Sequence, residues 1–100
     1  MSQDPIVIVS VARTAMGSFQ GGFSGLTAAN LGAEAIKAAV ARAGIDANLI
    51  EEVLMGCVLQ AGQGQAPARQ AALQAGLPLS AGCATIHKVC GSAMKATMLG

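Results

Sequence analysis

Short apolar runs alternate along this chain with alanine-rich stretches of helical spacing, and this alternation restricts the folds that the chain can adopt. The segments follow one another, starting with an apolar run, as residues 6–11, 28–43, 51–58, 66–75, 83–89 and 91–99. The apolar runs predict strands and the alanine-rich stretches predict helices. Parallel strands need a crossover connection, which is usually a helix. The sequence therefore predicts an α/β fold of βαβαβα order, with a mostly parallel sheet and helices on both faces.

The first run, residues 6–11, reads Ile-Val-Ile-Val-Ser-Val and is apolar on both faces. A strand that lies between two layers of helices has this pattern. We therefore expect residues 6–11 to form a central strand, parallel to the strand predicted at residues 51–58.

Capping residues mark the predicted ends of the helices. Thr27 can cap the N-terminus of the first helix, and Gly44 follows its last residue. Asp46 can cap a short turn, and Pro67 suits the first turn of the second helix. Each of these signals is local, so each predicts a helix end without reference to the rest of the fold.

The composition favours small side chains and close approach between elements. The 100 residues suit one domain and include 21 alanines and 13 glycines but only two aromatic residues. Only 11% are charged, against about a quarter in an average soluble domain. We infer that other structure covers much of the surface: a second copy, another chain, or a C-terminal remainder of the same polypeptide. The net charge of +1 and the absence of Trp and Tyr argue against a nucleic-acid surface.

Three cysteines, Cys57, Cys83 and Cys90, make an odd number without the density of a disulfide scaffold, which favours reduced thiols. The first five residues carry no basic region, and the apolar run that follows is too short to span a membrane. We therefore expect a cytoplasmic protein without a membrane segment.

The segment around Cys90 combines a predicted strand, a turn and a predicted helix. The sulfur would lie at the N-terminus of that helix, where the helix dipole favours a thiolate. Small neighbours at Gly91, Ser92 and Ala93 leave room for a thioester to approach. Cys90 is thus a candidate nucleophile, and the alternative is a buried, packed thiol, as most free cysteines are.

Three stretches of this chain, residues 12–19, 56–72 and 85–96, resemble the thiolase family of acyl-CoA acyltransferases. The resemblance covers nearly the whole chain but only the N-terminal part of the family, since thiolases are several times longer. It implies that residues 1–100 are the N-terminal part of the first thiolase-like domain, cut after Gly100. It also implies a homo-oligomer, a dimer or tetramer, whose substrates are coenzyme A and acyl-CoA thioesters, with no bound cofactor and no metal.

The same resemblance assigns a role to Cys90. In the family this cysteine takes up the acyl group as a thioester, and its backbone N–H contributes to the oxyanion hole. The other parts of the family site are a histidine, an asparagine-bearing segment and a second cysteine, all from C-terminal loops. The resemblance therefore implies an acetyl-CoA C-acetyltransferase as the full-length protein, and residues 1–100 alone are expected to be inactive.

Two positions near Cys90 depart from the family pattern: His87 stands where Asn is common, and Ala93 where Gly is common. Ala93 would narrow the acyl site. On an extended strand His87 and Cys90 face opposite sides, which favours a structural histidine over a base. A zinc site that uses Cys83, His87 and Cys90 is disfavoured, since residues 83 and 87 of a strand stand roughly 13 Å apart. Arg69 is expected to form a fixed structural pair.

Two alternative functions stay open at this point. A ketoacyl synthase has the same fold class but lacks the signatures at residues 63–70 and 88–92. A non-catalytic member of the thiolase superfamily, which binds lipid or acyl-CoA, would share the fold without an acyl-enzyme. An acetyl adduct on Cys90 would distinguish the enzyme from the binding subunit.

Overall fold

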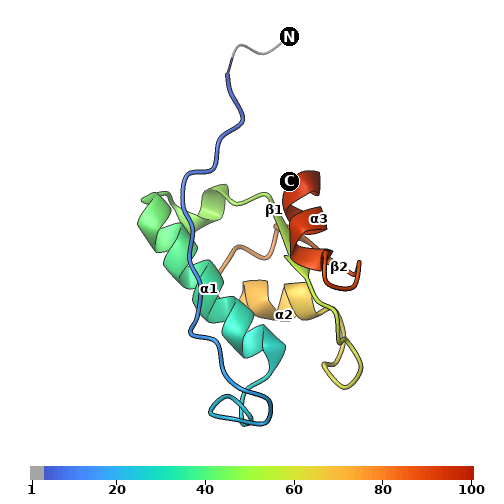
Figure 1. The fold of residues 1–100 in the computed structure, drawn as a ribbon. Helices are drawn as coiled ribbons and strands as arrows, with labels where there is room; N and C mark the ends of the chain where they lie inside the picture. The colour runs from blue at the N-terminus through green and yellow to red at the C-terminus, as the bar shows by residue number, and fades with distance from the viewer. Residues whose placement is uncertain (1–3) are drawn as a thin grey trace.

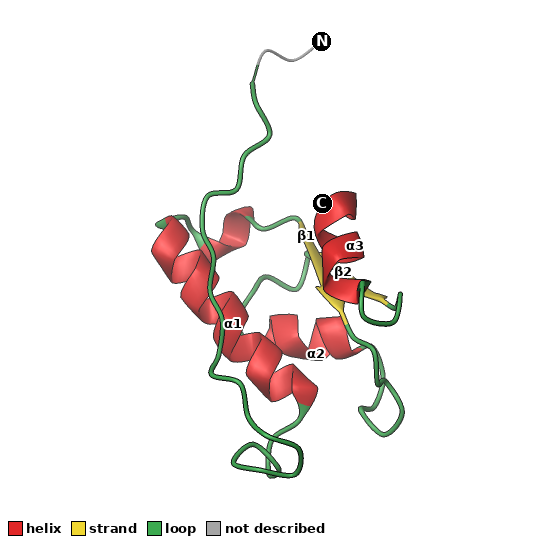
Figure 2. Cartoon of the chain, viewed as in Figure 1, coloured by secondary structure: helices red, strands yellow, loops and turns green. Residues whose placement is uncertain are grey.

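The computed structural model describes residues 4–100 (Figures 1 and 2). In chain order the elements are helix α1 (Ala28–Ala43), a 3₁₀ turn (Ala47–Leu49), strand β1 (Glu52–Gly56), helix α2 (Pro67–Gln74), strand β2 (Gly82–Ile86) and helix α3 (Ser92–Leu99). The three predicted helices and the second and third predicted strands are confirmed, and the strands are shorter than predicted. The composition and spacing of these segments therefore predict the three helices and the two short strands.

The two strands lie side by side and run parallel, with Glu52 opposite Gly82 and Gly56 opposite Ile86. Side chains alternate between the faces of a strand. Val53 packs with Ala72 of α2, whereas Gly56 meets the first turn of α3, so α2 and α3 cover opposite faces of β1. The prediction of parallel strands with helices on both faces is confirmed for this two-stranded sheet.

The predicted strand at residues 6–11 is wrong: in Figure 2 these residues belong to a long loop region that precedes α1. Ser10 Oγ donates to the Ala39 carbonyl at 2.7 Å, and Arg42 Nη1 donates to the Val11 carbonyl at 3.0 Å. These bonds hold the extended segment alongside α1 (Figure 1). The β-branched pattern specifies an extended backbone, but a strand also needs a partner, and here Ile6 is 97% exposed.

The predicted caps of α1 are confirmed. Thr27 Oγ1 accepts a hydrogen bond from Asn30 N at 3.1 Å, and Asn30 Oδ1 accepts one from Thr27 N at 2.9 Å. This reciprocal capping box satisfies backbone donors that the helix leaves unpaired. Gly44 ends the helix in the left-handed conformation, with φ of 68°. Asp46 caps the following turn through Asn48 N at 2.9 Å, as predicted.

Helix α2 fastens the loops at both ends of the sheet. Arg69 donates to the Ala81 carbonyl at 2.9 Å and to the Leu79 carbonyl at 3.1 Å, before β2. Gln70 Nε2 donates to the carbonyls of Gln63 and Gln65, at 2.8 and 2.7 Å, after β1. The fixed role predicted for Arg69 is correct, but its partners are carbonyl oxygens, which hold a guanidinium without a buried carboxylate.

The core consists of small residues, as the composition predicts. Val53, Ala72, Leu77 and Ala81 form its buried cluster. A Cβ added at Gly32 of α1 would lie 3.3 Å from Ala71 Cβ of α2, so these helices pack closely. Among the helices of residues 4–100, none combines the length and apolarity needed to cross a membrane.

The hydroxyl of Thr85 on β2 caps the N-terminus of α2, and its removal should destabilise the protein. Ala66 precedes α2 without a side-chain cap, and Thr85 Oγ1 instead accepts from Ala68 N at 3.0 Å. Thr85→Val keeps the shape but leaves this donor unpaired, so the free energy of unfolding should fall by about 1–2 kcal/mol in urea denaturation. The control is Thr97→Val, whose exposed hydroxyl bonds within α3. It should change the free energy by less than about 0.5 kcal/mol, and equal losses would contradict the cross-element cap.

The absence of a side chain at Gly56 lets α3 approach β1. A Cβ there would lie 2.6 Å from Ser92 C and 2.8 Å from Ala93 Cα, both backbone atoms that cannot rotate away. Gly56→Ala should therefore lower the free energy of unfolding by about 1–3 kcal/mol, or shift α3. Gly25→Ala is the matched control, because no atom lies within 4 Å of the added methyl. If Gly56→Ala leaves the free energy of unfolding unchanged in urea denaturation, the close approach of α3 to β1 is not rigid.

Candidate functional site

Cys90 lies in the turn between β2 and α3. Strand β2 ends at Ile86, and two backbone hydrogen bonds close the turn: Gly91 N to the Lys88 carbonyl at 2.9 Å and Ser92 N to the Val89 carbonyl at 3.2 Å. The Cys90 side chain is exposed. The interpretation of Cys90 as a buried thiol is therefore wrong, and the predicted strand-turn-helix presentation is confirmed.

The residue before Cys90 has an uncommon backbone conformation. Val89 has φ of 44°, in the left-handed region that β-branched residues rarely adopt. Ser92 Oγ accepts from Lys88 N at 2.8 Å and donates to the Val89 carbonyl at 2.7 Å, so one hydroxyl ties together the backbone of Lys88 and Val89. The turn is thus closed by side-chain as well as backbone hydrogen bonds.

Sequence reasoning missed Ser92 and Gly56 as residues that shape this turn. For Gly56 a signal existed, since a glycine inside a strand often marks close backbone approach. For Ser92 the signal was its place in the first turn of a helix, where serine often bonds to nearby backbone. Neither signal identifies the partner, which depends on the tertiary fold.

Among residues 4–100, the other candidate residues make no hydrogen bond with Cys90. Cys57 is half-buried at the end of β1, with its thiol 3.8 Å from the Leu59 carbonyl. Cys83 is half-buried and lies 3.9 Å from Arg69 Nη1. His87 is exposed, and within residues 4–100 no hydrogen bond or ion pair to its ring is found. No group of three or more His, Cys, Asp or Glu side chains in the described part of the chain could hold a metal ion.

The loops that follow β1 and β2 leave the sheet at the same edge, because the strands are parallel. Ligands of open α/β sheets bind outside the carboxyl ends of the strands. The turn with Cys90 follows β2 there, and the glycine-rich loop that Gln70 holds follows β1. The fold thus brings the nucleophile candidate and a fixed loop to one edge.

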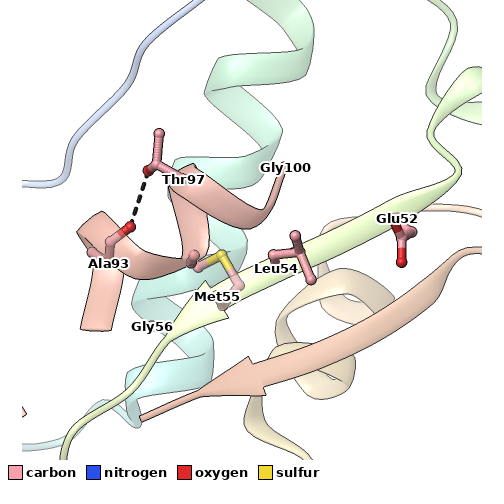
Figure 3. Close-up of a pocket in the computed structure, with 8 residues that line it drawn as sticks. Glu52, Leu54, Met55, Gly56, Ala93, Thr97 and Gly100 are labelled. Atoms are coloured by element: carbon pink, nitrogen blue, oxygen red, sulfur yellow. Dashed lines mark hydrogen bonds between the residues drawn. The ribbon is translucent and has the colours of Figure 1, made fainter. Parts of the chain in front are cut away.

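A separate cavity of about 580 Å³ lies between β1 and α3 (Figure 3). Leu54 and Met55 line it from the strand, and Ala93 and Thr97 line it from the helix. Cys90 does not line this cavity, and neither do Cys57 and Cys83. Ala93 therefore lies on the side of α3 that faces β1, so the structure gives no support to its predicted role in narrowing a site at Cys90.

The methionines of α3 do not fill the core. Met94 and Met98 are instead 71% and 72% exposed. Met55 of β1, by contrast, packs against the core cluster. Whether a large apolar side chain of a helix is buried thus depends on the face of the helix on which it lies. In an eight-residue helix, sequence spacing defines the buried face poorly.

Comparison with known proteins gives one consistent result. Residues 6–100 match the family described as Thiolase, N-terminal domain. The mitochondrial acetyl-CoA acetyltransferase B of Xenopus laevis is 63% identical over 94 residues, which are 94% of this chain and 22% of that protein. The acetyl-CoA acetyltransferase of Rhizobium meliloti is 52% identical over 100 residues, which are 100% of this chain and 25% of that protein.

Solved structures agree with these relatives. The structure of the Acat5 thiolase from Ascaris suum in complex with coenzyme A matches with a TM-score of 0.91 and 42% identity, over 93% of this chain and 24% of that chain. The acetyl-CoA acetyltransferase from Syntrophomonas wolfei matches with a TM-score of 0.85 and 37% identity, over 93% and 23% respectively. This chain spans about a quarter or less of the length of these proteins. By its sequence and its fold, the chain belongs to the thiolase family.

Proposed function

We propose that a protein carrying this chain transfers acyl groups between coenzyme A thioesters through a covalent acyl-cysteine on Cys90. The observation that carries the proposal is the exposed Cys90 at a strand-to-helix turn, in a chain whose relatives are named acetyl-CoA acetyltransferases. Coenzyme A as a substrate is supported by the Ascaris suum thiolase structure, which is described as a complex with coenzyme A.

The first half-reaction uses the Cys90 thiolate as nucleophile. Its sulfur attacks the acyl carbonyl carbon of an acyl-CoA, and the carbonyl oxygen becomes an oxyanion. Collapse of this intermediate breaks the bond to the coenzyme A sulfur, which leaves as a thiolate and takes up a proton. The backbone N–H of Cys90 is the proposed donor to the oxyanion, together with the dipole of α3, which starts two residues later.

The second half-reaction makes a carbon–carbon bond. A base removes a proton from the methyl group of acetyl-CoA, and the resulting carbanion attacks the acyl-cysteine carbonyl and expels the Cys90 thiolate. The product is acetoacetyl-CoA, and the reverse sequence is thiolytic cleavage. Among residues 4–100, His87 is the one histidine, and no bond joins its ring to another described residue. The family resemblance places the remaining site residues in C-terminal loops, so we assign the base to residues outside this chain. A cytoplasmic location and a dimeric or tetrameric assembly stay predictions.

Cys90→Ala should abolish acylation, which tests the assignment of the nucleophile. A full-length thiolase carrying residues 1–100 is incubated with acetyl-CoA and analysed by intact mass and peptide mapping. We expect an increase of about 42 Da on the peptide with Cys90 and none in the variant. Cys83→Ala is the matched control and should keep the adduct, because Cys83 is half-buried away from the turn. A parental protein without any adduct would favour the non-catalytic binding subunit.

The 100-residue chain alone should have no thiolase activity. It supplies the proposed nucleophile but not the base that the carbon–carbon step needs in either direction. The measurement is the loss of acetoacetyl-CoA absorbance after addition of coenzyme A, with a full-length thiolase carrying the same residues as the positive control. Cleavage by the purified chain above the rate in buffer would refute this prediction.

A further inference from the structure

Ser92 is the buried polar residue of the described chain, at 3% exposure. Burial of a hydroxyl is unfavourable unless its hydrogen bonds are made. Both bonds of Ser92 Oγ go to the turn that carries Cys90: it accepts from Lys88 N at 2.8 Å and donates to the Val89 carbonyl at 2.7 Å. The hydroxyl therefore bridges the Lys88 N–H and the Val89 carbonyl, and the backbone between these two groups includes the φ and ψ bonds of Val89 as well as the ψ bond of Lys88.

Val89 needs such a restraint. With φ of 44° it is in the left-handed region, where its β-branched side chain crowds the backbone. Its side chain is 62% exposed, so packing does not hold it there. Gln20 and Ala66, the other non-glycine residues with positive φ among those described, are not β-branched. The strained position is thus the residue directly before Cys90, and strain of this kind is often found at functional sites.

The conformation of Val89 sets the direction of Cys90. The peptide plane between Val89 and Cys90 carries the Cys90 N–H, and the torsions of Val89 orient that plane. The same torsions place the Cα of Cys90, from which its own φ and χ1 direct the sulfur. One restraint therefore limits the placement of both the nucleophile and the proposed oxyanion donor, and reaction rates depend steeply on such alignment.

We propose that Ser92 is a positioning residue, whose hydroxyl holds Val89 in the left-handed conformation and thereby aligns the Cys90 thiol and N–H for acyl transfer. This inference rests on the proposed function of Cys90. Ser92 itself does not contact the acyl group in this assignment. Its effect passes through the backbone of the turn.

The test compares Ser92→Ala in two backgrounds of a full-length thiolase carrying residues 1–100. The rate constant for acetyl transfer from acetyl-CoA to Cys90 is measured by rapid quench and mass spectrometry. In the parental background Ser92→Ala should lower it about 30-fold, with KM for acetyl-CoA changed by less than about twofold. In a Val89→Gly background Ser92→Ala should lower this rate constant by less than about threefold, because glycine adopts positive φ without strain.

A merely structural role for Ser92 gives a different pattern. Ser92→Ala would then lower the rate constant for acetyl transfer by the same factor in both backgrounds, since glycine at position 89 does not restore a buried hydrogen bond. That result, or a parental rate in Ser92→Ala, overturns the proposal. Thr97→Ala, which removes another hydroxyl of α3, is the control and should leave the rate unchanged. If Ser92→Ala does not fold, the double variant decides: folded and acylated supports the proposal, and unfolded overturns it.

The failure of this proposal differs from the failure of the proposed function. A parental protein that forms no adduct on Cys90 removes the proposed function. A parental protein that forms the adduct at the same rate as Ser92→Ala keeps that function and removes the role of Ser92. Alkylation of Cys90 by iodoacetamide in each variant checks that the thiol is still accessible.

Discussion

The close approach of the first turn of α3 to Gly56 is the contact on which the arrangement around Cys90 depends. A backbone that touches a strand without an intervening side chain has few ways to shift, because protein interiors are densely packed. Since α3 starts two residues after Cys90, this contact also fixes the distance of the thiol from the sheet. A larger residue at position 56 would move the helix and the turn together.

Helix α2 complements this contact from the opposite face of the sheet. Its Arg69 and Gln70 are adjacent in sequence but bond to loops at different ends of the strands. Thr85 Oγ1 of β2 accepts a hydrogen bond from Ala68 N in the first turn of the same helix. The polar groups of this alanine-rich helix are therefore used to order loops, and each loop carbonyl gains a donor that water would otherwise supply.

Local signals predicted the helix ends and the parallel pair of β1 and β2, whereas the strand predicted at residues 6–11 was wrong, for a physical reason. Thr27, Asn30 and Gly44 act within one helical turn, so their roles can be recognised in the sequence. A strand depends on a neighbour that can be distant in sequence, and residues 6–11 lie alongside α1 instead of joining the sheet. The exposed position of Cys90 followed from strand-turn-helix order. The left-handed conformation of Val89 could not be foreseen, because valine favours extended backbone.

The conformation of Val89 also separates two ways in which a chain can build such a turn. A glycine would adopt it without strain and would not need the hydroxyl of Ser92 to stay there. Valine has few accessible conformations, so a valine that is held by Ser92 gives a turn with a single geometry, at a cost in local strain. For the proposed acyl transfer the thiol and the N–H of Cys90 must act on the same carbonyl, and a turn of single geometry keeps them aligned between one half-reaction and the next.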